Sequence, residues 1–176
     1  VGDKAYLKGE YTEGLELNDN NRPHFGMMNN IAASGSVMSL LDGEGTSIEI
    51  PTKDCFHGLF EDCGTLTKAP ELPAVFLKEF CYYAMFKGCS ALTEAPVLPA
   101  ENMEPHCYSN MFDECVSITK APELKATSLA DYCYSYMFRL CASLAEPSAL
   151  SATTMKKGCY EGMFYNCYDL VSVTEL

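Results

Sequence analysis

The spacing of the cysteines constrains this chain more than any other feature of its sequence. All ten cysteines fall into two series in which neighbours are 26 residues apart. The first series is Cys55, Cys81, Cys107, Cys133 and Cys159, and the second is Cys63, Cys89, Cys115, Cys141 and Cys167. They define four full units and 18 residues of a fifth, so the chain is predicted to be a repeat protein.

Other positions of the unit are also fixed in type. The second position is always aromatic, and the sixth position is Phe60, Phe86, Phe112, Phe138 and Phe164. Stacked units would place each such set in a column, so we expect these phenylalanines and the ten cysteines to form structural ladders.

The spacing within a unit predicts a short helix followed by a short strand. Cys81, Met85 and Cys89 recur four residues apart, as do Tyr82 and Phe86, which is typical of one helical face. A branched apolar residue, an Ala-Pro pair and a fixed Leu then indicate a short extended segment closed by proline. Because one such unit cannot bury its apolar face alone, the predicted fold class is an α/β repeat solenoid with a parallel sheet.

One run of the repeat resembles a known family. Residues 85 to 99 read M-F-x-x-C-x-x-L-T-x-A-P-x-L-P, and residues 111 to 124 repeat this in part. The run resembles the BspA-like leucine-rich repeats of bacterial surface proteins, in a longer variant with two cysteines per unit. Met or Leu replaces the family's usual Ala before Phe, and the proline is displaced to Pro147 in the fourth unit.

The resemblance covers residues 55 to 176. It implies a right-handed superhelix displayed outside the cell, often lipid-anchored through a segment absent from this chain. It further implies a non-catalytic role in adhesion or host contact, with a protein or a glycan on a host or neighbouring cell surface as partner. We expect a monomer. A carbohydrate-binding surface module and a structural spacer that carries another domain are the alternative functions.

Residues 1 to 54 do not share the repeat and are predicted to be an N-terminal cap that is partly β. They contain turn-forming segments at residues 18 to 21 and 42 to 45, and an Ile48-Glu49-Ile50-Pro51 run that resembles a degenerate strand. A solenoid needs atypical terminal units to cover its open ends.

The cysteines allow several kinds of chemistry. A line of C-x7-C pairs does not converge as zinc or iron–sulfur ligands do. A disulfide within one helical segment would have to span about 12 Å, well beyond disulfide reach. Disulfides between neighbouring units remain an alternative, but the favoured interpretation is a column of buried thiols that pack as small apolar groups.

Charge and motifs exclude other classes of function. A net charge of −12 with 12 scattered basic residues disfavours nucleic acid as a partner. No stretch is apolar for long enough to predict a membrane span. His24, His57 and His106 belong to no catalytic motif and are interpreted as surface residues, so we expect no enzyme activity, no metal and no cofactor.

Two sets of columns are candidates for a surface role. The fourteenth column, which includes Lys120 and Glu146, alternates in sign, so it is predicted to stabilise stacking rather than to bind a ligand. The third, fourth and seventh columns vary and carry Tyr83, Tyr136 and Tyr165. Tyrosine offers amphipathic contact area, so these three are the candidate partner-binding residues.

Overall fold

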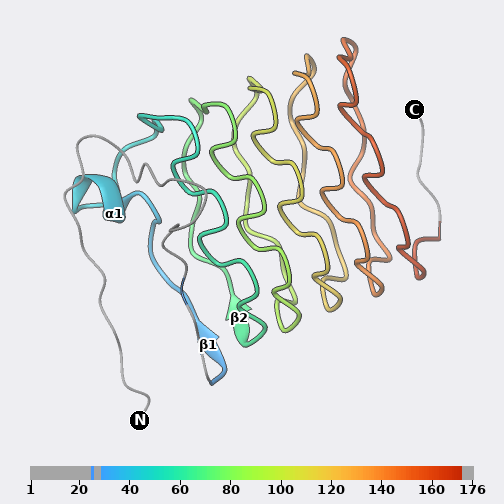
Figure 1. The fold of residues 1–176 in the computed structure, drawn as a ribbon, viewed down its shortest axis with the longest axis horizontal. Coiled ribbons are helices and arrows are strands. Elements are labelled where there is room, and N and C mark those ends of the chain that lie inside the picture. Colours follow the sequence, from blue (N-terminus) through green and yellow to red (C-terminus); the bar gives the residue numbers. More distant parts are fainter. Residues whose placement is uncertain (1–24, 26–28, 172–176) are drawn as a thin grey trace.

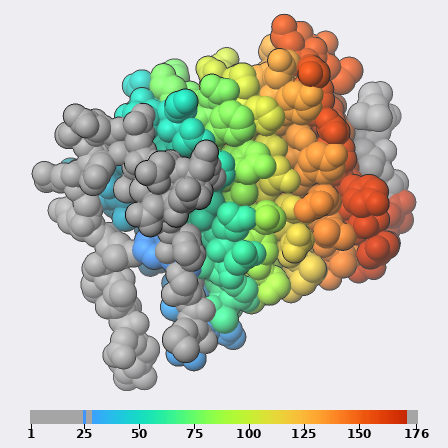
Figure 2. Space-filling model, viewed as in Figure 1, coloured from blue at the N-terminus to red at the C-terminus, as the bar shows by residue number. Residues whose placement is uncertain are grey.

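Successive 26-residue units lie side by side in chain order along the long axis of the molecule (Figure 1). The structure is a computed structural model, and it describes residue 25 and residues 29–171. In the space-filling view the units form adjacent bands of colour (Figure 2). We number them units 1 to 5, each from the first cysteine of the unit.

Little of the described chain is regular helix or strand. Strand β1 (Ile31–Ala32) pairs in parallel with β2 (Leu66–Lys68), and the short helix α1 (Ser39–Asp42) lies between them in sequence. Further parallel contacts are isolated bridges: Ser36 with Glu71, Glu49 with Phe76, Asn102 with Ser128, Lys120 with Glu146, and Ser128 with Thr154. The predicted strand therefore forms as β2 in unit 1, and among the described residues of the later units the Lys120–Glu146 bridge is the one bridge in that segment.

The helix predicted at residues 81–89, and at the equivalent residues of the other units, is wrong. These segments are runs of turns in which two kinds of backbone hydrogen bond alternate. In unit 3, one set of N–H groups donates to the carbonyl three residues earlier: Ser109, Met111, Asp113 and Cys115. The intervening N–H groups donate to carbonyls of unit 4 over 2.8 to 3.1 Å: Tyr108, Asn110, Phe112 and Glu114.

Left-handed residues every four positions rule out an α-helix there. In unit 3 the φ angles of His106, Asn110 and Glu114 are 54°, 55° and 63°, whereas an α-helix needs negative φ throughout. The equivalent residues of the other units also have positive φ. They are residues 54, 58 and 62 before and in unit 1, residues 80, 84 and 88 for unit 2, residues 132, 136 and 140 for unit 4, and residues 158, 162 and 166 for unit 5. A ribbon of turns that repeats every four residues puts Cys107, Met111 and Cys115 on one buried face, as a helix would.

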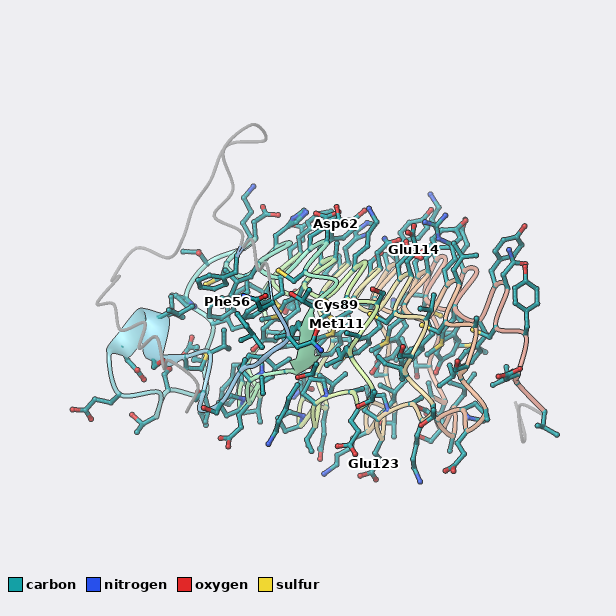
Figure 3. All side chains as sticks on the ribbon, turned by 90° about the horizontal axis from the view of Figure 1, so that it is seen from below. Phe56, Asp62, Cys89, Met111, Glu114 and Glu123 are labelled. Carbon is teal, nitrogen blue, oxygen red and sulfur yellow. The ribbon has the colours of Figure 1, made fainter. Side chains whose placement is uncertain are left out.

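The interior of the coils holds two aromatic ladders. Ring centroids of neighbouring units lie 5.7 to 6.0 Å apart in one ladder: Phe56, Tyr82, Tyr108, Tyr134 and Tyr160. They lie 5.5 to 5.8 Å apart in the other: Phe60, Phe86, Phe112, Phe138 and Phe164. Figure 3 shows Cys89 and Met111 between the two sides of the coils, with charged side chains such as Glu114 and Glu123 on opposite outer rims.

The segment before unit 1 packs onto the same core. Met38 and Ile50 are fully buried against it, and the Phe25 ring lies 5.2 Å from that of Phe60. The Asp42 carboxylate, in the predicted turn, accepts backbone N–H groups of residues 44 to 47 just after Gly43, which has a φ of 73°. The first 24 residues of the predicted cap (residues 1–54) lie outside the described residues. They include His24 and the predicted turn at residues 18 to 21, so the cap remains a prediction.

The ten cysteines are free thiols, and nine of them are buried. The second series has a specific contact, because four of its five thiols donate to the carbonyl of the phenylalanine 29 residues earlier, and Cys63 donates to the carbonyl of Phe25. The four are Cys89, Cys115, Cys141 and Cys167, and their contacts are 3.0 to 3.1 Å long. Burial raises the pKa of the Cys81, Cys89 and Cys133 thiols to about 12. These thiols therefore stay protonated at neutral pH, and each of the four contacts links two units.

We expect the thiols of the native protein to resist a disulfide reagent at pH 8. A thiolate is the reacting species, and burial both suppresses its formation and blocks access. Cys167, which is partly exposed and whose pKa is raised by burial to about 11, should react first. Absorbance of the released thiol should show all ten reacting in guanidinium. Prompt reaction of several cysteines without denaturant would contradict this packing.

Replacing Tyr108 by Phe should stabilise the fold. The hydroxyls of Tyr82 and Tyr108 are buried and have no hydrogen-bond partner in the described part of the chain. Removing one should raise the free energy of unfolding by about 1 kcal/mol, since a buried unpaired hydroxyl is unfavourable. Urea denaturation measures this, with Tyr160→Phe at the half-buried end of the same ladder as control. A loss of stability in Tyr108→Phe would refute the prediction.

Candidate functional site

An open groove of about 800 Å³ crosses the turn face of the units. It is lined by His57, Phe80, Tyr83, His106, Ser109, Asn110, Tyr132, Ser135, Tyr136, Arg139 and Glu161. These residues come from every unit and repeat at 26-residue intervals, so the groove is a product of stacking.

One wall of the groove is a ladder of three rings that directly precede the first cysteines of units 2 to 4. The rings of Phe80 and His106 lie 4.4 Å apart at 8°, and those of His106 and Tyr132 lie 5.0 Å apart at 13°. The Lys157 Nζ follows, 5.4 Å from the centre of the Tyr132 ring. Because both faces of the His106 ring are covered by Phe80 and Tyr132, this wall offers mainly ring edges to a ligand.

His106 is held as a neutral residue within this wall. Desolvation by the stacked rings lowers its pKa, against the opposing effect of Glu79 and Asp131. His57 and His106, which were predicted to be surface residues, are both partly exposed and line the groove. His57 Nδ1 lies 3.1 Å from the Asp54 carboxylate, and its ring lies 4.5 Å from that of Tyr83.

The floor of the groove is the third column of the repeat. Its middle members, Ser109 and Ser135, are small and buried. The Ser109 hydroxyl donates to the Ser135 carbonyl over 3.2 Å, and the Asn110 amide donates to the Ser109 hydroxyl over 3.0 Å. Tyr83 and Glu161 occupy the same column on either side, so the floor is low only across units 3 and 4.

The second wall contains Tyr136 and Arg139. The Tyr136 hydroxyl donates to Glu161 Oε1 over 3.0 Å, and this hydrogen bond raises the pKa of Tyr136. The ring packs over Gly162, where an added Cβ would lie 2.3 Å from it. Gly162 also has a φ of 57°, so both the close approach and the backbone favour glycine there.

Arg139 is anchored by a carboxylate that the sequence analysis did not single out. Its Nε and Nη2 donate to the two oxygens of Asp113 over 2.8 and 2.6 Å, and Asp113 is fully buried. Lys87 and Glu61, in the same seventh column, pair over 2.9 Å. This column therefore alternates in sign as the fourteenth does, where the predicted pairing of Lys120 with Glu146 occurs over 2.8 Å.

The three candidate tyrosines do not share one site. Tyr83 and Tyr136 line the groove, whereas Tyr165 is 60% exposed and is not part of its lining. The sequence analysis missed the Phe80, His106 and Tyr132 wall. The signal was present, since three successive units carry a ring in the column just before the first cysteine.

The described residues contain no group of three or more His, Cys, Asp or Glu side chains that could hold a metal ion. Nor does any helix within the described ranges combine the length and apolar character of a bilayer span. Comparisons with protein-family models, with curated proteins and with solved structures found no match.

Replacing Arg139 by Met should destabilise the protein, because it leaves the Asp113 carboxylate buried without its partner. We expect a loss of about 2 kcal/mol in the free energy of unfolding, below the value for a fully buried pair since Arg139 is partly solvated. Lys120→Met removes an exposed partner from the fourteenth column and should change stability little. If both variants lost the same free energy of unfolding in urea denaturation, the pair of Arg139 with Asp113 would contribute no more to stability than the exposed pair of Lys120 with Glu146.

Proposed function

We propose that this chain is a non-catalytic recognition module that acts at a cell surface, in adhesion or contact with a host or neighbouring cell. The observation that carries the proposal is the groove, whose lining combines three tyrosines, two histidines and hydrogen-bonding side chains from successive units. Aromatic residues with polar tips are enriched where proteins bind partners, because they bury apolar area while keeping a hydrogen bond.

The polar groups of the groove support binding rather than reaction chemistry. Arg139 is paired with Asp113, Tyr136 with Glu161, and Ser109 with the Ser135 carbonyl. Each of these contacts holds a side chain in place. A catalytic site more often leaves a titratable group in hydrogen-bond reach of a nucleophile.

The wider proposal follows the resemblance to BspA-like leucine-rich repeats. In this proposal the side-by-side units form a right-handed solenoid that acts as a monomer, with residues 1–54 as its cap. The chain would then be displayed outside the cell and held there by a lipid-anchored segment. The side-by-side units and the ladders along them support this arrangement (Figure 1).

Binding of the fluorescently labelled protein to intact host cells and to neighbouring bacteria tests the proposal. The double variant Tyr83→Ala/Tyr136→Ala should bind at least about tenfold more weakly, because it removes two aromatic contacts from the groove. The matched control is Tyr165→Ala/Tyr168→Ala, which removes two exposed tyrosines outside the groove lining.

Two results would count against this function. Binding no stronger than that of an unrelated acidic protein would favour a structural spacer. Equal loss in the groove variant and the control variant would place recognition elsewhere on the surface.

A further inference from the structure

The third column of the repeat changes abruptly in side-chain size along the stack. It reads His57, Tyr83, Ser109, Ser135 and Glu161 from unit 1 to unit 5. Large side chains at both ends and two buried serines between them leave a hollow above units 3 and 4. The ring wall that includes His106 bounds this hollow on one side, and larger side chains flank it along the stack.

Tyr83 lines this hollow on the side of unit 2. Its ring neighbours are His57, one unit before it at 4.5 Å, and Phe80, in a tilted contact at 5.7 Å. Rings in the core ladders have a further ring one unit later, but Tyr83 is followed by Ser109 in its column. Within residues 25 and 29–171, no ring stacks on the side of Tyr83 that faces unit 3.

The polar groups around the hollow are nearly neutral as a set and offer both donors and acceptors. The charge of Arg139 is offset by Asp113, with Glu114 also 3.6 Å away. The exposed Glu161 carboxylate accepts the Tyr136 hydroxyl at Oε1, and no side chain of the described residues hydrogen-bonds to its Oε2. Lys157, at the end of the ring wall, is a further cation near the hollow, and it interacts with Tyr132, Asp131 and Glu161. An anionic ligand would therefore meet cations that already have carboxylates nearby.

We propose that this hollow binds a neutral sugar ring of a surface glycan, which deepens the proposed function and rests on it. The apolar face of the sugar lies on the Tyr83 ring, and its hydroxyls hydrogen-bond with Glu161 and Ser135. A compact polyhydroxylated ring fits the low part of the groove over Ser109 and Ser135, between the larger side chains of Tyr83 and Glu161. Sites of this size bind small ligands through a few placed polar groups and aromatic contact.

The test is an array of neutral mono- and oligosaccharides, followed by calorimetric titration with whichever saccharide binds. Tyr83→Ala should weaken binding by about tenfold, since it removes the stacking face. Glu161→Gln keeps the size of an exposed side chain and should also weaken binding several-fold, because an ionised acceptor is replaced by a neutral amide. Tyr165→Ala is the matched control and should bind as the native chain does. Thermal unfolding of each variant checks that the fold is retained.

Two outcomes overturn the proposal: native protein that binds no neutral saccharide, or saccharide binding that neither Tyr83→Ala nor Glu161→Gln weakens. The cell-binding assay separates this failure from failure of the proposed function. If groove variants abolish cell binding and the binding is removed by protease but not by glycosidase treatment of the cells, the groove recognises protein. In that case the sugar assignment is wrong while the recognition function stands.

Discussion

The structure depends on an alternation in the direction of backbone N–H groups. In the turn segments of units 1 to 4, every second N–H closes a turn within its own unit, and the others donate to the carbonyls of the next unit. In unit 3, for example, Met111 donates to the Tyr108 carbonyl and Phe112 to the Met137 carbonyl. An insertion of one residue would exchange the two sets, so the constant 26-residue length is a requirement of the hydrogen bonding.

Once the length is constant, every column of side chains meets itself in the next unit. This is why flat rings stack in the core and why charges in the seventh and fourteenth columns pair across units, as in Lys87 with Glu61 and Lys120 with Glu146. A like charge in both places would repel, and a small side chain leaves space. The groove arises from small side chains, because Ser109 and Ser135 interrupt a column whose side chains are large on either side of them.

The sequence carries enough information for the period, the packing columns and part of the site. The pairing of Lys120 with Glu146 follows from the alternating charges of the fourteenth column alone. Tyr83 and Tyr136 were predicted because they stand in columns whose residue type varies from unit to unit. The helix was predicted wrongly because a ribbon of four-residue turns and a helical face share the i, i+4 spacing. Left-handed backbone at His106, Tyr136 and Leu140 could not be predicted, since these residues rarely adopt it and give no glycine signal.

The same left-handed residues explain how the groove can be rigid. His106, Asn110, Tyr132 and Tyr136 all have positive φ, which is unfavourable by roughly 1 kcal/mol or more for each L-residue. Each is held by its own N–H, which donates to the next unit over 2.7 to 3.0 Å. Backbone strain of this kind persists only where surrounding contacts determine the conformation, and here it recurs in every unit, inside and outside the groove. Under the proposed function, a backbone held in this way would leave less conformational entropy to be lost when a partner binds.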